Sequence, residues 1–490
     1  MANASSAALA SAAARLKPSP SDHFMEKKKP IGFVSGRFFL FFTAVVSAVF
    51  YAGYLDRELW FDEVLTLQFA LLPSPLEIYR SYTIPNNQIV HTWFIHWLVN
   101  CGIPPESMRL FPLLCAILTI IILWRAFSRE KGSLPLTVAL TALMVSPPFL
   151  LYASALRGYM LAALLTVSAL CSARKYALSG NRIALALWFL SAFFACGVMP
   201  SALAGIGAAG LYSIPYCGKK YWRNRRVYLL AATAIAGFLL FYAPIVRNLL
   251  QAFDLKEGWH EPFAAILAVT VAVAVTFLLP LAAGAFFHHP RLRELPRTLI
   301  WFLPLGALIL PVYPFPRVWF ILFPVMALLT AGYLRRLPEK GLKILWAAAL
   351  FWGIFSCTAL FRESVSLPVS RGGQDDFYAP RFVRQSFTPS LTARMLCREY
   401  AASGSGIFIT FDADPFALNY ALAAADKEAV LPPVVIDVPF GKVKGVPENT
   451  LCVLSADDDP AVYEKRFTGK LWEVYHNGIH KVYLFRRESK

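Results

Sequence analysis

The stretch "FFLFFTAVVSAVFYAGYLDRELWFDEVLTLQFA" (residues 38–70) joins an apolar run of membrane-spanning length to two adjacent carboxylates. Residues 38–55 carry no charged side chain, which is typical of a helix that crosses a bilayer. Asp62 and Glu63 follow shortly afterwards, among aromatic and aliphatic neighbours, where a membrane surface should begin. The stretch therefore predicts a membrane protein with polar chemistry at one surface.

The composition extends this interpretation to most of the chain. Hydrophobic residues make up 57% of the 490 residues and charged residues 16%, against about 25% in soluble domains. We expect a mainly α-helical, polytopic membrane bundle with about eleven spans. The expected spans cover residues 38–55, 107–125, 134–152, 157–173, 183–199, 200–216, 228–246, 263–287, 298–313, 317–334 and 342–361.

Composition also divides the chain into three parts. Residues 1–35 are rich in Ala and Ser and then basic, without the order of a signal peptide, so we expect a disordered cytoplasmic leader. Residues 36–361 form the membrane domain, and the more polar residues 362–490 predict a small soluble α/β domain. In that domain Asp414-Pro415 is typical of a helix start, and Asn477-Gly478 is typical of a hairpin turn.

Lysines and arginines indicate which way the bundle faces. The net charge of +17 comes largely from short loops between apolar runs, and we find no nucleic-acid-binding motif, so the charge sets orientation. With a cytoplasmic N-terminus and about eleven spans, 18 Lys and Arg fall in cytoplasmic loops and 7 in the opposite connections. This distribution predicts that loop 56–107 and the C-terminal domain face outward.

The count depends on residues 86–102, "NNQIVHTWFIHWLVNCG", which are apolar but short and carry two histidines. A crossing helix here would invert every later loop and break the positive-inside distribution. Aromatic side chains also favour the membrane interface. We therefore expect this segment to lie at the interface, or to dip into it, without crossing.

The residues alone support two interpretations of the carboxylate pair. Asp62 is a suitable cap for a helix starting at "EVLTLQFALL", because its carboxylate would accept hydrogen bonds from the first backbone N–H groups. A carboxylate held between Trp60, Phe61 and the membrane surface would instead be partly desolvated, which makes it a stronger base. The cap does not account for the aromatic neighbours, and buried structural carboxylates share the pattern of a base, so both interpretations stay open here.

Four stretches in order along residues 36–340 resemble the GT-C glycosyltransferases. The resemblance is to the family-39-like branch, which includes protein O-mannosyltransferases and lipid A aminoarabinose transferases. The stretches are "LWFDEVLTLQFA", "PNNQIVHTWFIHWLVNCGIPPESMRLFPLLCAILTIIILWRAF", "PPFLLYASALRGYMLAALL" and "YPFPRVWFILFPVMALLTAGYLRRL". The ordered set carries the resemblance rather than any single motif.

The resemblance implies an inverting transfer of a sugar from a polyprenyl-phosphate donor to a lipid, glycan or protein acceptor outside the cytoplasm. Asp62 matches the catalytic position, where it would act as the base on the acceptor hydroxyl. Glu63 matches the second position, where it would bind the acceptor or hold the loop. No cofactor is certain. Some GT-C enzymes bind a divalent metal through an acidic residue near the position of Arg157, and "SALRGYM" has none, which puts metal dependence in doubt.

The resemblance also implies how the donor phosphate is bound. Arg157 and Arg317 lie at outward ends of spans, where a guanidinium fork would meet a lipid phosphate. Snorkelling to head groups, or pairing with a loop carboxylate, is the alternative for each. Arg109 and Tyr159 are implied as supporting residues, and anchoring suits Arg109 better than substrate contact.

Residues 86–88 match a donor-phosphate signature of related branches. Asn87 and Gln88 are the implied ligands, although Gln88 stands where one version of the signature has a histidine. Glutamine donates a hydrogen bond to phosphate but brings no charge. His91 lies one turn on and would compensate, unless it is simply an interfacial histidine.

Other functions and details stay open from the sequence. A transporter or flippase of lipid-linked sugars is the alternative function, although we find no clear internal repeat. A noncatalytic protein whose tail binds a partner is a third class. The resemblance favours a bacterial inner membrane with a periplasmic site, and an endoplasmic reticulum location fits the topology equally. Cys397 and Cys452 would pair only if the tail faces an oxidising compartment.

Overall fold

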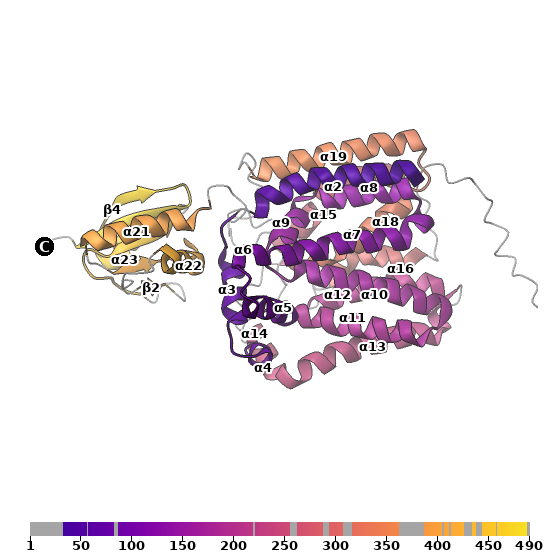
Figure 1. Ribbon diagram of the computed structural model, residues 1–490, viewed down its shortest axis with the longest axis horizontal. Coiled ribbons are helices and arrows are strands. Elements are labelled where there is room, and N and C mark those ends of the chain that lie inside the picture. The colour runs from indigo at the N-terminus through magenta and orange to yellow at the C-terminus, as the bar shows by residue number, and fades with distance from the viewer. Residues whose placement is uncertain are drawn as a thin grey trace, which may run out of the picture.

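Long helices and a small five-stranded sheet occupy opposite ends of the computed structural model (Figure 1). The predicted leader lies outside the described residues up to its last three positions, where the first helix begins at Phe33. The structure describes residues 33–55, 57–82, 87–218, 221–254, 262–287, 294–306, 316–361, 387–403, 406–410, 413–425, 434–437, 443–456 and 458–487.

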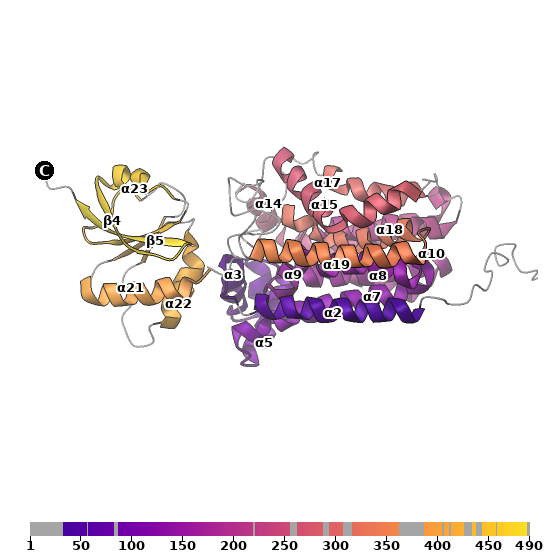
Figure 2. The same ribbon diagram turned by 90° about the horizontal axis from the view of Figure 1, so that it is seen from above.

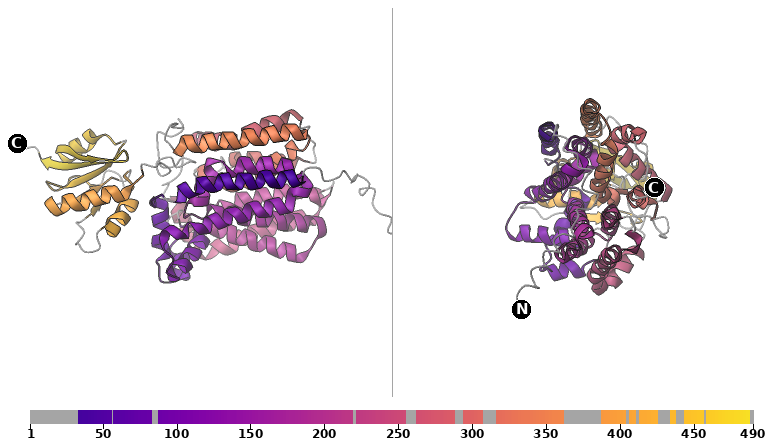
Figure 3. Two further views of the ribbon diagram at one scale, coloured as in Figure 1. Left: turned by 45° about the horizontal axis from the view of Figure 1, so that its top comes forward. Right: turned by 90° about the vertical axis from the view of Figure 1, so that its right-hand side faces the viewer.

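The membrane domain is a bundle of roughly parallel helices, which Figure 3 also shows end on. Its helices are α2 (Phe33–Leu55), α7 (Leu110–Lys131), α8 (Ser133–Met144), α9 (Pro147–Ser154), α10 (Tyr159–Ser179), α11 (Arg182–Val198), α12 (Ala202–Ser213), α13 (Arg225–Tyr242), α14 (Val246–Asp254), α15 (Pro262–Phe287), α16 (Leu295–Thr298), α17 (Leu303–Gly306), α18 (Phe323–Leu334) and α19 (Glu339–Phe361). Helix α18 lies in the core of the bundle, since the apolar span Arg317–Leu334 that contains it is 83% buried. Helix α2 lies at the rim, since its span Gly36–Leu55 is only 22% buried.

The expected polytopic fold is confirmed, and the spans divide more finely than expected. Among the described residues, seven helices are long and apolar enough to cross a membrane, or eight if α8 and α9 count as one bent span. Two shorter apolar helices coincide with the expected spans 183–199 and 200–216. The expected span 298–313 breaks into short pieces up to Gly306, and its remainder lies outside the described residues.

The expected span 134–152 is not one straight helix, because the chain bends by 66° between α8 and α9. Ser146 ends the first helix, and its hydroxyl accepts a hydrogen bond from the Phe149 N–H, which caps the second. Pro147 and Pro148 follow at the start of α9, where a missing N–H costs nothing. The bend directs residues 155–158 towards the outward loop, the name given to residues 56–107 because the sequence predicts that they face outward.

The outward loop folds into four short helices at the end of the bundle nearest the C-terminal domain (Figures 1 and 2). They are α3 (Phe61–Ala70), α4 (Pro75–Arg80), α5 (Ile89–Asn100) and α6 (Pro105–Met108). Twelve residues of α5 extend about 18 Å, less than the roughly 30 Å of a bilayer core. Its length therefore agrees with the prediction that residues 86–102 do not cross.

The C-terminal domain contains a mixed sheet in the order β2-β1-β3-β5-β4. The first three strands in this order are parallel, and β5 pairs antiparallel with β3 and with β4. The predicted hairpin joins β4 to β5, with Gly478 at a φ of 81° in its turn. The elements are β1 (Ile407–Ile409), β2 (Val434–Ile436), β3 (Leu451–Ser455), β4 (Gly469–His476), β5 (His480–Arg487), α21 (Pro389–Ser403), α22 (Pro415–Ala425) and α23 (Pro460–Phe467).

Helices cover both faces of this sheet, as Figure 2 shows. Helices α21 and α22 pack on one face and α23 on the other, and each face has its own apolar cluster. Cys397 borders the first cluster and Cys452 belongs to the second. Because the sheet separates them, they stay thiols and do not form a disulfide.

A buried ion pair ties the outward loop to the bundle. Arg109, at the junction of α6 and α7, donates through Nε to Glu63 Oε1 at 2.9 Å and through Nη2 to Oε2 at 2.6 Å. The same guanidinium donates to the carbonyls of Leu55, Arg57 and Glu58. One side chain therefore joins the end of α2, the start of α3 and the start of α7.

Glu63 completes this clamp from its own side. Its Oε1 also accepts the Leu156 N–H at 2.6 Å, and its Oε2 accepts the Trp60 N–H at 3.3 Å. The carboxylate and the guanidinium are both buried, so each depends on the other for compensation of its charge.

Replacing Arg109 by Leu should therefore unfold the loop. The change leaves Glu63 buried without its counter-charge, which costs about 3–5 kcal/mol. We expect a markedly lower Tm in thermal unfolding of the detergent-purified protein. Arg80→Leu is the matched control, since Arg80 is exposed and makes no ion pair with any described residue. Equal Tm values for the two variants would contradict the clamp.

Candidate active site

Asp62 lies in the first turn of α3 and is 1% exposed. Its Oδ2 is 3.2 Å from Arg317 Nη1 and 3.9 Å from Arg157 Nε. Two guanidinium groups therefore compensate the burial of one carboxylate. The structure thus brings the expected base and both expected phosphate-binding arginines into one site.

Two separate segments deliver these arginines. Arg157 follows α9 in the short connection to α10, and its Nη1 donates to the Asp62 carbonyl at 3.1 Å and to the Thr66 hydroxyl at 3.0 Å. Arg317 is the second residue of the 3₁₀ segment Pro316–Leu322. Both side chains are buried, so neither reaches a bulk head-group region by snorkelling.

Aromatic rings connect the two arginine segments behind the site. The Tyr159 ring lies 4.5 Å from the Tyr152 ring, which lies 4.9 Å from the Phe320 ring. Tyr159 begins α10 directly after the Arg157 turn, and Phe320 follows Arg317 in the same 3₁₀ segment. Tyr159 therefore supports the site through packing.

Glu63 is paired with Arg109, whereas Asp62 is paired with Arg157 and Arg317. The contacts of the clamp, described above, use both oxygens of Glu63 on protein groups. This geometry fits the expectation that Glu63 holds the loop better than the expectation that it binds an acceptor. Arg109, similarly, has the anchoring position expected of it.

Asn87 and Gln88 are buried against backbone groups of the protein. Asn87 Nδ2 donates to the Ile78 carbonyl at 3.0 Å, and Gln88 Oε1 accepts the Gly158 N–H. Gly158 is essential to this approach, because a Cβ there would lie 2.6 Å from Val198 and 2.9 Å from the His91 Cβ. Gln88 therefore holds the turn that presents Arg157, and Asn87 holds the start of α5 against α4. Asn86 lies outside the described residues.

His91 is fully buried on α5 beside this turn. Burial, and secondarily the positive charge of Arg157, lowers the pKa of His91 to about 3. It is therefore neutral at physiological pH and brings no positive charge in place of the missing histidine at position 88. Neither ring nitrogen has a hydrogen-bond partner among the described residues.

The structure corrects the interpretation of Asp62 as a helix cap. Helix α3 begins at Phe61, one residue before Asp62, and the Phe61 N–H donates to Asp414 Oδ2 at 2.9 Å. The cap thus comes from the C-terminal domain, 353 positions away in sequence. The sequence predicts a helix start at Asp414-Pro415, and Asp414 Oδ1 does accept the Ala417 N–H at the start of α22. The contact of Asp414 with α3 has no signal in the sequence.

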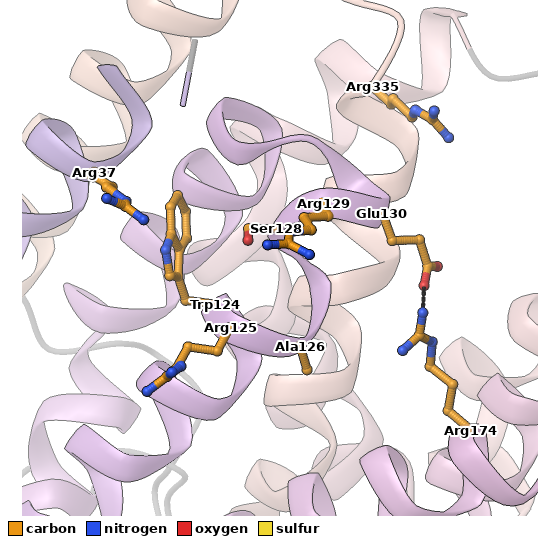
Figure 4. Close-up of a pocket in the computed structure, with 9 residues that line it drawn as sticks. All are labelled: Arg37, Trp124, Arg125, Ala126, Ser128, Arg129, Glu130, Arg174 and Arg335. Carbon is orange, nitrogen blue, oxygen red and sulfur yellow. Dashed lines mark ion pairs between the residues drawn. The ribbon is translucent and has the colours of Figure 1, made fainter. Parts of the chain in front are cut away.

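A polar cavity lies towards the other end of the bundle, and Figure 4 shows its lining residues. Its α7 residues begin at Trp124, roughly 20 Å along the helix from the Arg109 end of α7. Its walls hold no residue expected to be catalytic, so it is not the candidate active site. Within the described residues, no three His, Cys, Asp or Glu side chains gather as a metal site.

Comparisons with known proteins identify the fold. No protein-family model matches the chain, and no curated protein matches it. The apo structure of ArnT from Cupriavidus metallidurans is 14% identical with a TM-score of 0.52, and the match covers 92% of this chain and 98% of that one. The same ArnT bound to undecaprenyl phosphate (16% identity, TM-score 0.49, 90% and 97% covered) and mycobacterial AftD (16%, 0.48, 91% and 41%) are less similar in structure. The first match confirms the expected fold: a GT-C-like membrane bundle followed by a small C-terminal domain.

Proposed function

We propose that this chain is an integral-membrane glycosyltransferase that moves a sugar from a polyprenyl-phosphate donor to an acceptor outside the cytoplasm. The observation that carries the proposal is the buried site in which Asp62 meets Arg157 and Arg317. Such a transfer needs a base for the acceptor and positive charge for the leaving phosphate. The fold supports it, because ArnT is itself a lipid A aminoarabinose transferase.

The reaction follows from these roles as a single displacement. The acceptor oxygen forms a bond to the anomeric carbon while Asp62 takes its proton. The bond from that carbon to the phosphate oxygen breaks on the opposite side, so the configuration inverts. The electron pair leaves with the polyprenyl phosphate, whose added negative charge Arg157 and Arg317 stabilise.

The contacts of Asp62 with both arginines suggest an order of events. The phosphodiester of the donor carries one negative charge, as a carboxylate does, and offers two oxygens to a guanidinium fork, so it would compete with Asp62 for the two guanidinium groups. Donor binding would then release the Asp62 oxygen from Arg317 and leave it to accept a proton. The base would thus become available only when the donor is in place.

The distribution of basic loops supports a site outside the cytoplasm, and the outward loop and the C-terminal domain lie at the same end of the bundle (Figure 1). The bacterial inner membrane, with a periplasmic site, follows from the resemblance to bacterial GT-C enzymes and is part of the proposal. A flippase of lipid-linked sugars is the competing function. It would need the arginines for the phosphate and no base for an acceptor. The role of Asp62 therefore separates the two functions.

Replacing Asp62 by Asn should reduce sugar transfer by about 100-fold or more, the usual contribution of a general base. Binding of the donor should persist, because both arginines remain. The measurement is turnover and donor affinity of the purified protein with a panel of polyprenyl-phosphate sugars and membrane-extracted acceptors. Glu77→Gln is the control, since Glu77 is an exposed carboxylate on α4 at the same end.

Arg317→Lys should instead weaken donor binding, because lysine loses the bidentate fork. Arg80→Lys, at an exposed arginine of the same end, should leave it unchanged. Full transfer activity in Asp62→Asn would refute the proposed base. Normal lipid flipping without any transfer by the unmodified protein would establish the flippase instead.

A further inference from the structure

We propose that Asp414 and Phe416 of the C-terminal domain are positioning residues for Asp62, so that this domain must dock on α3 for full turnover. The inference rests on the proposed function of Asp62. It adds a role for the C-terminal domain, which neither sequence nor fold comparison assigns.

Three contacts join the domain to the four residues before Asp62. Asp414 caps the Phe61 N–H, and the Phe416 ring packs edge-on against the Phe61 ring at 4.7 Å. Glu58 accepts the Ser390 N–H at 2.8 Å and the Ser390 hydroxyl at 2.6 Å. The domain therefore contacts both ends of the segment that leads into α3.

The first turn of a helix has N–H groups with no partner within the helix. In α3 the Phe61 N–H depends on a residue from another domain. Asp62 follows directly, so the direction of its carboxylate depends on the first turn being formed. Loss of the cap would fray this turn while the Glu63 clamp still holds the rest of the loop.

The turn that presents Asp414 is itself built for this contact. Asp414 has a φ of 50°, the left-handed region, which aspartate tolerates better than most residues. His480 lies behind the turn, with Nε2 2.9 Å from the Ala413 carbonyl and Nδ1 2.9 Å from the Thr392 hydroxyl. Core side chains of the domain thus hold the capping residue in a sparsely populated conformation.

Asp414→Ala should lower kcat roughly tenfold to a hundredfold, because small misplacements of a catalytic group have effects of this size. The donor Kd should stay unchanged. Hydrogen exchange of the peptide covering residues 61–66 should become faster. Asp414→Asn keeps one carbonyl oxygen as an acceptor and should retain more of kcat than the alanine variant.

Asp459→Ala is the matched control, because Asp459 caps α23 in the same domain and α23 packs on the sheet face away from α22. If Asp414→Ala matches this control in kcat, or lowers kcat without faster exchange at residues 61–66, the positioning role is wrong. If the unmodified protein transfers no sugar, the proposed function fails instead. Faster exchange in Asp414→Ala would still show that the domain caps α3.

The same contact should depend on pH. Burial, with smaller contributions from Asp62 and Glu63 on α3, raises the pKa of Asp414 from 3.8 to about 7, despite hydrogen bonds from Ala417 and Phe61 that lower it. The docked state therefore binds a proton. The stabilisation of docking by the protonated Asp414 carboxyl is full below pH 3.8 and is lost as the pH rises through about 7.

Residues 61–66 should therefore exchange faster, after correction for intrinsic rates, as the pH rises from 4 to 7. Asp414→Asn should lack this part of the pH dependence. The charged groups that face this contact are the same in both proteins, so their effects cancel in the difference. They are Arg109, Arg157 and Arg317 behind the α3 carboxylates, Glu58 beside Ser390, and His480 behind Ala413. The same pH dependence in both proteins would contradict the assignment.

A different observation carries a second inference: we infer that the cavity in Figure 4 binds the phosphate group of an anionic phospholipid. Four helical segments contribute its cations, and the cavity volume is about 1020 Å³. The lining arginines are Arg37, Arg125, Arg129, Arg174 and Arg335, with Glu130 as the acidic member.

Glu130 pairs with only one of these five arginines, Arg174. Its carboxylate is already bound by Arg174 at 2.8 Å, by Lys131 at 3.4 Å and by the Tyr216 hydroxyl. Arg125 and Arg129 make no ion pair with any described residue and are exposed. Two of the five lining arginines therefore have no counter-charge among the described residues.

The surroundings favour a lipid over a free anion. Phe38 and Phe41 are 63% and 69% exposed beside Arg37 on α2, and Ile121 is 45% exposed one turn before Arg125 on α7. A ligand here would meet cations at its head and apolar side chains along its tails. The basic loops also predict that this end is cytoplasmic, where anionic lipids bind pockets of this kind.

The test measures lipid retained by the full-length protein in native mass spectrometry after purification from vesicles of phosphatidylcholine containing cardiolipin or phosphatidylglycerol. We expect retention of the anionic lipids over phosphatidylcholine and a roughly tenfold loss in Arg125→Gln/Arg129→Gln, each phosphate contact by arginine being a charge-assisted one. Arg182→Gln/Arg223→Gln, two exposed arginines of the same end, should match the unmodified protein. Equal retention in both variants, or binding of inorganic pyrophosphate in place of lipid, would overturn the assignment.

Discussion

The buried pair of Glu63 and Arg109 is the constraint on which the outward end of this protein depends. Arg109 joins three chain segments through a single guanidinium, and Glu63 adds the turn before α10 through the Leu156 N–H. Neither charge is stable at this depth without the other. The pair therefore holds the first turn of α3 against the end of α2 and the start of α7.

Two adjacent carboxylates consequently have different roles. Glu63 is surrounded by groups of the protein, whereas Asp62 faces two arginines from segments that belong to other parts of the bundle. A clamp must be fully satisfied to be rigid, and a base must have an oxygen that a substrate can reach. Under the proposed function, these two requirements fall on neighbouring residues, Glu63 and Asp62.

The C-terminal domain shares in the same site rather than standing apart from it. Asp414, Phe416 and Ser390 contact Phe61 and Glu58, and the capping residue is held by the domain's own core. At the opposite end of the bundle, the basic cavity suggests a second contact with the membrane that is independent of the chemistry. A transferase of this design would respond to domain docking at one end and to lipid at the other.

The sequence by itself determined the membrane bundle, the polar C-terminal domain and its hairpin. These features follow from apolar run length, alternation and turn residues, which are local. It also singled out Asp62, Arg157 and Arg317, through order along the chain and resemblance rather than geometry. Only the tertiary structure decided that these three meet, that Glu63 and Arg109 form a clamp, and that Asp414 caps α3. The reason is physical: ion pairs and caps between segments tens to hundreds of residues apart depend on packing, and local pattern carries no information about it.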